Sequence, residues 1–282
     1  MIDADFLNQL AKFTLLIRKR VTSSYIGARK SVSAGRGMVF RDYRVYVQGD
    51  DFRAIDWKIY ARTDDLYVKN YEEERNLVVH IIIDRSGSMD YGKSITKYDY
   101  AARIGAGFAY LALKGNEKFM FSSYADNLEI FQPRRGMSQL ASMIYYLNNL
   151  KPKGNSKLLE TVIQYRRIIG SRAMIVLLSD FLISLDEIKE ALCNLGNNEI
   201  KIIQVIDPVE KNLMMEGDFN LKDIESGTRL RTYISPRLRM EYLSMMAKHC
   251  SEIENCCNSL GIEYQLISTD TPIFDAFYKM LE

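Results

Sequence analysis

The sequence predicts a doubly wound α/β domain with a mostly parallel sheet, preceded by a smaller β-rich segment. Two apolar runs rich in β-branched residues, at 77–83 and 200–206, are typical of strands buried on both faces of a sheet. Segments with helical spacing separate such runs, and alternating strands and helices form parallel sheets that helices cover on both sides. The length of 282 residues, 47% of them hydrophobic, suffices for one large domain or two small ones.

The first quarter of the chain is predicted to be a helix followed by a polar, β-rich appendage. Phe6, Leu10, Phe13 and Ile17 recur at helical spacing, so a helix is expected to end near Arg20. The further elements expected here are a strand at 38–47, a turn at 49–51, a short helix at 54–62 and a short strand at 66–68. We therefore place the helix and appendage at residues 1–75 and the α/β domain at 76–282.

Strands and helices alternate from residue 76 onward. The strands are expected at 77–83, 118–124, 128–131, 173–178, 200–206 and 262–267. The helices are expected at 97–114, 137–150, 158–169, 185–195, 236–260 and 272–281. A polar hairpin is expected as an insertion near 215–235.

The net charge of +2 conceals an uneven distribution. Eight basic residues and no acidic one lie between Phe6 and Arg41, so the rest of the chain carries −6. Such a basic stretch is compatible with a polyanionic partner. The alternative is a solvated face whose charges pair with acidic residues after folding. A polar block at Asp50–Arg62 also has two possible roles. It is either an internal ion-pair network or a docking surface.

Composition also bears on location. No apolar run approaches the roughly 20 residues that a membrane-spanning helix needs, and the opening residues show no secretory signal. No CxxC spacing occurs among the four cysteines, which we expect to be reduced and mostly buried. They are Cys193, Cys250, Cys256 and Cys257. We therefore expect a cytoplasmic protein.

Polar side chains follow two of the predicted buried strands and one loop between them. Asp84, Ser86 and Ser88 form a DxSxS pattern directly after the first buried strand, and Asp180 follows the strand at 173–178. Ser156 comes from the loop that opens the helix at 158. In open α/β sheets ligands bind at the carboxyl ends of the strands, and hard oxygen donors are what Mg²⁺ or Mn²⁺ prefers. Capping of helices by the serines is the structural alternative.

These motifs resemble the metal-ion-dependent adhesion site of von Willebrand factor A domains, which are Rossmann-like. The segment GRGMVFRDYRVYVQGDDFRAIDWKIYARTDDLYVKNYEEERN, running directly into VVHIIIDRSGSM, resembles the domain of unknown function 58 family more specifically. LLSDF and IDPVE add to this resemblance, which spans about residues 23–269. Members of that uncharacterised family are companions of MoxR-type AAA+ ATPases.

The resemblance implies a site made of Asp84, Ser86, Ser88, Ser156 and Asp180 that holds Mg²⁺ or Mn²⁺. Ser156 stands where the family motif usually has a threonine, and it retains the donor oxygen while it lacks the methyl group that restricts the rotamer. An ion held by few charged ligands keeps an open position for a carboxylate from a partner.

The expected function is therefore a non-enzymatic protein-interaction module, with no catalytic residues. By resemblance, its partners are a MoxR-type ATPase and a client protein, in chaperone-like assembly or maturation. The alternative is a nucleic-acid or anionic-surface binder that uses the basic stretch 12–41, although we expect no nucleic-acid partner. A metal-dependent hydrolase is the weaker alternative, since no general base with a second catalytic partner can be named.

Three other motifs do not predict a site. The GxG of Gly105–Gly107 lies inside a helical pattern, which favours helix packing over dinucleotide binding. No GxxxxGK[ST] motif occurs, so no ATP hydrolysis is expected. His80 and His249 are single and far apart in sequence, which favours a structural role over zinc ligation.

Overall fold

The structure is a computed structural model of the chain. It describes residues 2–20, 34–72, 78–134, 136–169, 173–196, 198–213, 215–222 and 228–281. These residues form two compact units. The first, the α/β unit, consists of Met1–Leu15 and Leu77–Glu282, and the second, the appendage, of Leu16–Asn76.

A six-stranded sheet forms the centre of the α/β unit, in the order β10-β7-β6-β3-β4-β5. All neighbouring strands pair in parallel except β4 and β5, which are antiparallel. The strands are β3 (Val78–Asp84), β4 (Lys118–Tyr124), β5 (Leu128–Arg134), β6 (Met174–Ser179), β7 (Glu199–Ile206) and β10 (Glu263–Ser268). The predicted doubly wound, mostly parallel architecture is confirmed, and the strand at 128–131 proves to be the antiparallel edge.

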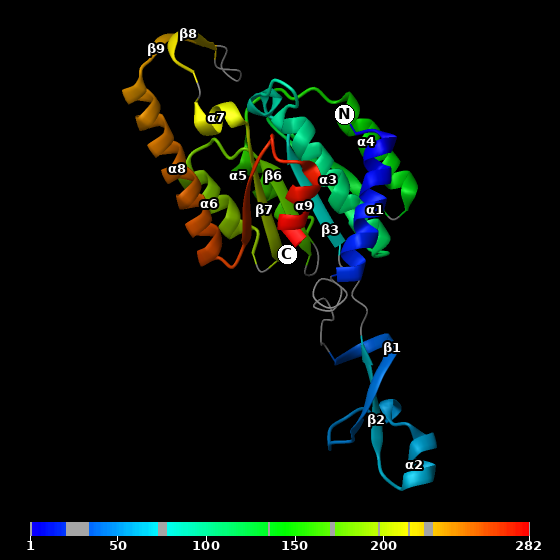
Figure 1. Cartoon of the computed structure of the whole chain (residues 1–282). Helices are drawn as coiled ribbons and strands as arrows, with labels where there is room; N and C mark the ends of the chain where they lie inside the picture. The colour runs from blue at the N-terminus through cyan, green and yellow to red at the C-terminus, as the bar shows by residue number, and fades with distance from the viewer. Residues whose placement is uncertain are drawn as a thin grey trace. The chain divides into compact units, whose positions relative to one another are not determined.

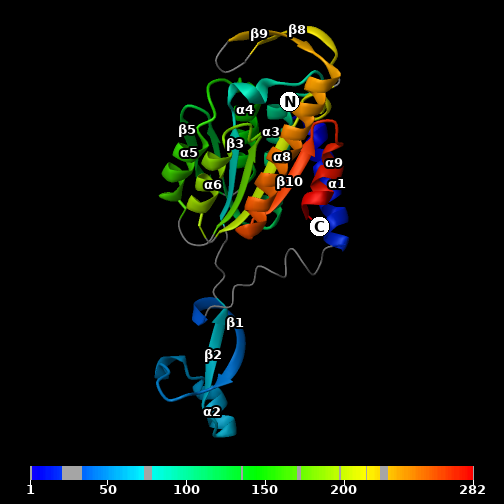
Figure 2. The ribbon, with the colours of Figure 1, turned by 90° about the vertical axis from the view of Figure 1, so that its left-hand side faces the viewer.

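Helices cover both faces of this sheet (Figures 1 and 2). The helices on one face are α1 (Ala4–Arg20), α3 (Lys97–Lys114), α4 (Met137–Asn149) and α9 (Ile273–Leu281). Those on the other face are α5 (Leu158–Arg166), α6 (Leu185–Asn194) and α8 (Pro236–Ser259). Because both faces are covered, every residue of β6 is buried, as are all of β3 after Val78.

The chain changes direction across the sheet next to β3. The strand that follows β3 in sequence, β4, pairs on one side of it, whereas β6 pairs on the other side. The carboxyl ends of β3 and β6 therefore form the topological switch point, where open α/β sheets bind their ligands. Asp84 is the last residue of β3, and Asp180 directly follows β6.

Close packing of α3 explains its two glycines. A Cβ atom on Gly107 would lie 1.9 Å from Cζ of Phe277 in α9, and one on Gly105 would lie 2.8 Å from Cδ1 of Ile83 in β3. A Cβ on Gly107 would overlap the Phe277 ring, and one on Gly105 would require the end of the Ile83 side chain to shift. The prediction that this GxG serves helix packing is confirmed.

The opening residues pack on the α/β unit and not with the appendage, with which the sequence analysis grouped them. Asn148 of α4 binds Ile2 through its side chain, accepting from the Ile2 N–H at 2.8 Å and donating to the Ile2 carbonyl at 2.9 Å. The ring of Phe6 lies 6.0 Å from that of Phe274, and the ring of Phe13 lies 5.3 Å from it. The apolar stripe of α1 therefore packs against α9.

The appendage is a two-stranded antiparallel sheet with short helices. Its elements are β1 (Ala34–Val45), η1 (Phe52–Ala54), α2 (Trp57–Thr63) and β2 (Tyr67–Glu72). Within the polar block, Asp50 forms a bidentate pair with Arg44 at 2.6 and 2.7 Å, and Asp56 accepts from Lys69 and caps α2. Two acids of the block therefore make ion pairs inside this unit with basic residues outside the block, and the role of the block as a network or a docking surface stays a prediction.

The remaining elements are a short helix and a hairpin after β7, and a 3-10 turn after β3. A five-residue helix that the sequence analysis did not predict, α7 (Pro208–Asn212), begins with a capping box of Asp207 and Glu210. The predicted hairpin is confirmed as β8 (Gly217–Lys222) paired antiparallel with β9 (Arg229–Ile234). A 3-10 turn, η2 (Gly87–Asp90), lies between β3 and α3.

The structure bears on two expectations from composition, which concern membrane-spanning helices and cysteines. None of the described helices is long and apolar enough to span a membrane. All four cysteines are free, but only Cys257 is buried; Cys193 is exposed, so the expectation of mostly buried thiols is wrong. Of the basic stretch, residues 21–33 lie outside the described residues, and the partner predicted for it stays a prediction.

Candidate metal centre

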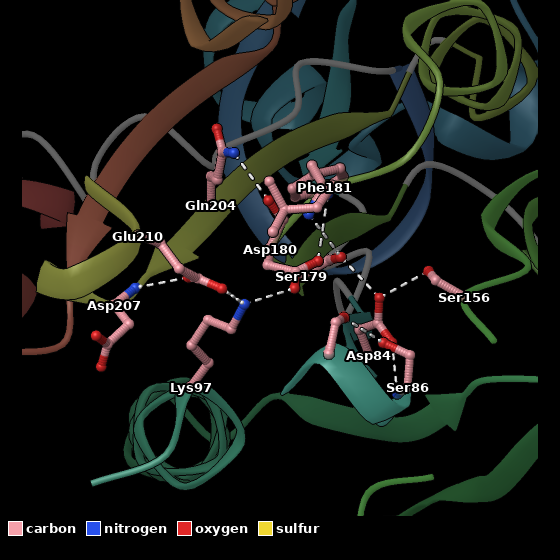
Figure 3. Close-up of polar contacts among 12 residues, drawn as sticks. Asp84, Ser86, Lys97, Ser156, Ser179, Asp180, Phe181, Gln204, Asp207 and Glu210 are labelled. Carbon is pink, nitrogen blue, oxygen red and sulfur yellow. Dashed lines mark hydrogen bonds and ion pairs between the residues drawn. The ribbon is translucent and has the colours of Figure 1, made fainter. Parts of the chain in front are cut away.

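The site forms where three loops meet at the switch point. The Asp84 carboxylate, which is fully buried, accepts hydrogen bonds from three directions (Figure 3). Its Oδ2 accepts from the Ser156 hydroxyl at 2.8 Å and from the Ser179 hydroxyl at 2.7 Å, and its Oδ1 accepts from the Ser86 N–H at 2.8 Å. Residues that are far apart in sequence thus converge on one carboxylate.

The two serines of the DxSxS pattern lie next to each other. The hydroxyl oxygens of Ser86 and Ser88 are 3.1 Å apart, and Ser86 is fully buried. Four of the five predicted residues, Asp84, Ser86, Ser88 and Ser156, are therefore joined by hydrogen bonds into one cluster.

The serines do not act as helix caps, which was the structural alternative. Ser86 is the N-cap residue of η2, but its side chain makes no capping hydrogen bond. Ser156 precedes the N-cap of α5, which is Lys157 and also lacks a side-chain capping bond. The hydroxyl groups are directed at Asp84 and at each other instead.

Backbone contacts hold the two serine loops together. The Gly87 N–H donates to the Gly154 carbonyl at 2.8 Å, and the Lys153 N–H donates to the Arg85 carbonyl at 2.8 Å. Gly154 has φ +94°, and a Cβ there would lie 2.2 Å from Oδ2 of Asp126. Only glycine therefore allows this approach, which brings Ser156 within reach of Asp84.

Asp180, the fifth predicted residue, is engaged elsewhere. Its Oδ2 accepts from the Lys97 ammonium at 2.8 Å, and its Oδ1 accepts from the Leu182 N–H at 3.3 Å. Lys97 also donates to Oε1 of Glu210 at 2.6 Å (Figure 3). The carboxylate expected to face an ion thus forms a buried ion pair with a lysine of the chain.

Three side chains of the site were not predicted from the sequence. Ser179 was visible as the residue before Asp180, but nothing in the motif distinguished its role. Tyr124 ends β4 beside Asp84, and its fully buried hydroxyl makes no hydrogen bond among the described residues. Lys97, also fully buried, had no local signal, because its partners are 83 and 113 residues away in the sequence.

The electrostatics of the site follow from burial and from neighbouring charges. Burial raises the pKa of Asp84, and the negative charge of Asp180 raises it further, against the hydrogen bonds from Ser179 and Ser86. Burial and the charge of Asp84 raise the pKa of the Tyr124 hydroxyl. A cation beside Asp84 would favour the ionised form of its carboxylate.

Burial alone would lower the pKa of the Lys97 ammonium, but Asp180 and Glu210 together raise it above its ordinary value. Burial raises the pKa of Glu210 in spite of the lysine beside it. The lysine is thus held in its charged form between two carboxylates.

The donor set fits a hard divalent ion. One carboxylate and several hydroxyl oxygens gather at Asp84, and the unpartnered hydroxyl of Tyr124 adds another polar atom at this position. No cluster of three or more His, Cys, Asp or Glu side chains suited to a metal occurs in the described part of the chain. An ion bound here would therefore use serine oxygens, as Mg²⁺ and Mn²⁺ accept and softer ions do not.

The two histidines have structural contacts. Nδ1 of His80 lies 2.9 Å from the Tyr165 hydroxyl, inside the core. Nε2 of His249 lies 2.8 Å from the carbonyl oxygen of Phe181, which has φ +52°. The Phe181 N–H also donates to the Ser179 hydroxyl at 3.0 Å, so His249 supports the loop that carries Ser179 and Asp180.

Strand order and site together define a doubly wound α/β protein with a hydroxyl-and-carboxylate cluster at its switch point. Residues 42–252 match the family described as "Protein of unknown function DUF58", and the chain belongs to that family.

Several known proteins are similar to this chain. The uncharacterized protein Rv1480 of Mycobacterium tuberculosis is 26% identical over 267 residues, which cover 93% of this chain and 84% of that protein. The crystal structure of the hypothetical protein BatB from Bacteroides thetaiotaomicron has a TM-score of 0.47 and 17% identity, covering 72% of this chain and 96% of that one. The VWA domain of SpRpn10 has a TM-score of 0.44 and 13% identity, covering 72% and 94%.

Proposed function

We propose that this chain is a non-enzymatic protein-interaction module that binds Mg²⁺ or Mn²⁺ at Asp84, Ser86, Ser88 and Ser156. A carboxylate of a protein partner then completes the coordination of the ion. The observation that carries this proposal is the convergence of three serine hydroxyls and one buried carboxylate at the switch point, with no helix-capping role for those serines.

The chemistry of the cluster supports binding over catalysis. A site with one ionised ligand leaves half of the charge of a divalent ion uncompensated, which favours an anionic ligand from outside. His80 and His249 are both engaged away from the cluster, so neither supplies a general base there. The two histidines therefore give no support to a hydrolytic step.

Family resemblance suggests the partners. We propose a MoxR-type AAA+ ATPase as the companion, with the pair acting in the assembly or maturation of a client protein in the cytoplasm. A carboxylate side chain on that ATPase, or on the client, is the group that the ion would bind.

Cation-dependent capture tests this proposal. The immobilised chain is incubated with a purified MoxR-type ATPase of the same organism in Mg²⁺ and in excess chelator. We expect capture in Mg²⁺ only, and its loss in Asp84→Asn, which removes the charged ligand but keeps the side-chain shape. The affinity of this variant for Mg²⁺ should be more than about 100-fold lower than that of the wild-type chain. Loss of a group that only supports a metal ligand typically lowers the affinity by roughly 100-fold at most.

The matched control is Asp186→Asn, which changes an exposed aspartate in the first turn of α6. It should retain capture and Mg²⁺ binding. Circular dichroism should show the wild-type fold for both variants. Capture that is equally strong with chelator present would contradict the proposal.

A further inference from the structure

Lys97 is a buried cation beside the candidate metal centre. Its side chain is fully inaccessible to solvent, and its ammonium group lies 2.8 Å from Oδ2 of Asp180 and 2.6 Å from Oε1 of Glu210. Lys97 is the first residue of α3, directly after the N-cap Thr96. The start of a helix is its positive end and disfavours a lysine, so helix stability does not explain this residue.

We propose that Lys97 sets the cation affinity of the site, by holding Asp180 as its own counter-ion and opposing the charge of a divalent ion at Asp84. This inference rests on the proposed function, because it concerns the regulation of that same site.

The surroundings of Asp180 leave its carboxylate little freedom to turn away from Lys97. Gln204 donates through Nε2 to the Asp180 carbonyl at 2.8 Å, and the Tyr264 hydroxyl holds Gln204 in turn at 2.6 Å. The Leu182 N–H occupies Oδ1. The side chain of Asp180 is 3% exposed, so its attraction to Lys97 is poorly screened by water.

Glu210 connects this ion pair to α7. Its Oε1 accepts from Lys97, whereas its Oε2 accepts from the Asp207 N–H at 3.1 Å as part of the capping box. Asp180 and Glu210 thus share one ammonium group. Any change at α7 that withdraws Glu210 leaves the lysine to Asp180 alone and makes the site more positive.

Two variants should change the cation affinity in opposite directions. Lys97→Met keeps the length of the side chain and removes its charge, so we expect the affinity for Mg²⁺ to rise at least about tenfold. Glu210→Gln keeps the shape of the side chain and one acceptor oxygen for Lys97 but removes a negative charge, so we expect weaker Mg²⁺ binding. Isothermal titration calorimetry of the full chain with MgCl₂ at constant pH measures both.

Lys201→Met is the matched control. Lys201 is another largely buried lysine of the α/β unit, paired with Glu263 at the start of β10 and away from the carboxyl ends of the strands. This variant should leave the Mg²⁺ affinity unchanged.

A second readout concerns thermal stability. Lys97→Met leaves the buried carboxylate of Asp180 and the partly buried one of Glu210 without their counter-ion, so its midpoint of thermal unfolding should fall in chelator. Adding Mg²⁺ should raise this midpoint more than in the wild-type chain, because the ion replaces the lost positive charge.

The outcomes separate this inference from the proposed function. Mg²⁺ binding by the wild-type chain with equal or weaker binding by Lys97→Met would overturn the inference and leave the function standing. Absence of Mg²⁺ binding in the wild type and in every variant would overturn both. If Lys97→Met does not fold, Glu210→Gln decides: weaker binding supports the role of Lys97, and unchanged or tighter binding contradicts it.

Discussion

His80 lies in the middle of β3, and its environment makes the stability of the protein depend on pH. Burial lowers the pKa of His80 from 6.5 to about 4. In the unfolded chain this histidine takes up a proton below pH 6.5, whereas in the folded chain it does so only near pH 4. Its contribution to stability is therefore complete above pH 6.5 and is lost as the pH falls from 6.5 to 4.

We predict that His80 accounts for a loss of about 3 kcal/mol in the free energy of unfolding across that range. In His80→Phe this part of the pH dependence should disappear, as measured by urea unfolding at pH 7 and pH 4.5. Tyr165→Phe, which removes only the hydrogen-bond partner, should keep the wild-type slope, because burial and not that bond lowers the pKa. Equal slopes in wild type and His80→Phe would refute the assignment.

Single residues of the candidate site differ in how far the sequence predicts them. Asp84, Ser86 and Ser88 follow directly from a motif after a buried strand, and Ser156 from a loop before a helix. The engagement of Asp180 with Lys97 does not follow, because a pairing across 83 residues depends on how α3 docks on the sheet. The unpartnered hydroxyl of Tyr124 depends in the same way on the pairing of β4 with β3.

At the scale of elements, the close contact of α3 with α9 depends on the absence of a side chain at Gly107. Ring atoms of Phe277 occupy the space that a Cβ on Gly107 would need, 1.9 Å from that position. We predict that Gly107→Ala destabilises the protein by about 1–3 kcal/mol, because overpacking forces the helices apart or the ring out of its rotamer.

Gly115→Ala provides the control for this prediction. Gly115 follows the same helix with an ordinary φ of −78°, and a Cβ there would be 3.4 Å from its nearest neighbour. Its substitution should change the free energy of unfolding by less than about 0.5 kcal/mol, within the usual range of surface changes. Equal effects of the two substitutions in urea unfolding would contradict the packing argument.

Elements long enough to show a repeated hydrophobic pattern were predictable from the sequence, whereas the shortest α-helix, α7, was not. The helix at Lys97–Lys114 and the strand at Lys118–Tyr124 have the bounds that their patterns predict. The five-residue helix α7 has too few residues to show a period, although its capping residues Asp207 and Glu210 gave a local signal. The antiparallel direction of β5 reflects its short connection to β4, which no periodicity reports.

At the scale of the whole molecule, the order of the strands positions the site. β3 and β6 are neighbours in the sheet but are separated by two strands and three helices in sequence, so Asp84 meets Ser179 only after the sheet is assembled. The sequence predicts this class of sheet and hence the edge at which ligands bind. It does not predict that residues up to Leu15 join the α/β unit, because their apolar stripe fits any apolar surface.

The binding of a divalent ion at Asp84 is the central claim, and a crystal structure of the chain in MnCl₂ tests it most directly. We predict an anomalous peak among Asp84, Ser86, Ser88 and Ser156, with ligand oxygens at roughly 2.0–2.2 Å in octahedral geometry. The peak should be absent from crystals of Asp84→Asn grown in the same solution. A wild-type crystal without such a peak at millimolar Mn²⁺, or an unchanged peak in Asp84→Asn, would contradict the account.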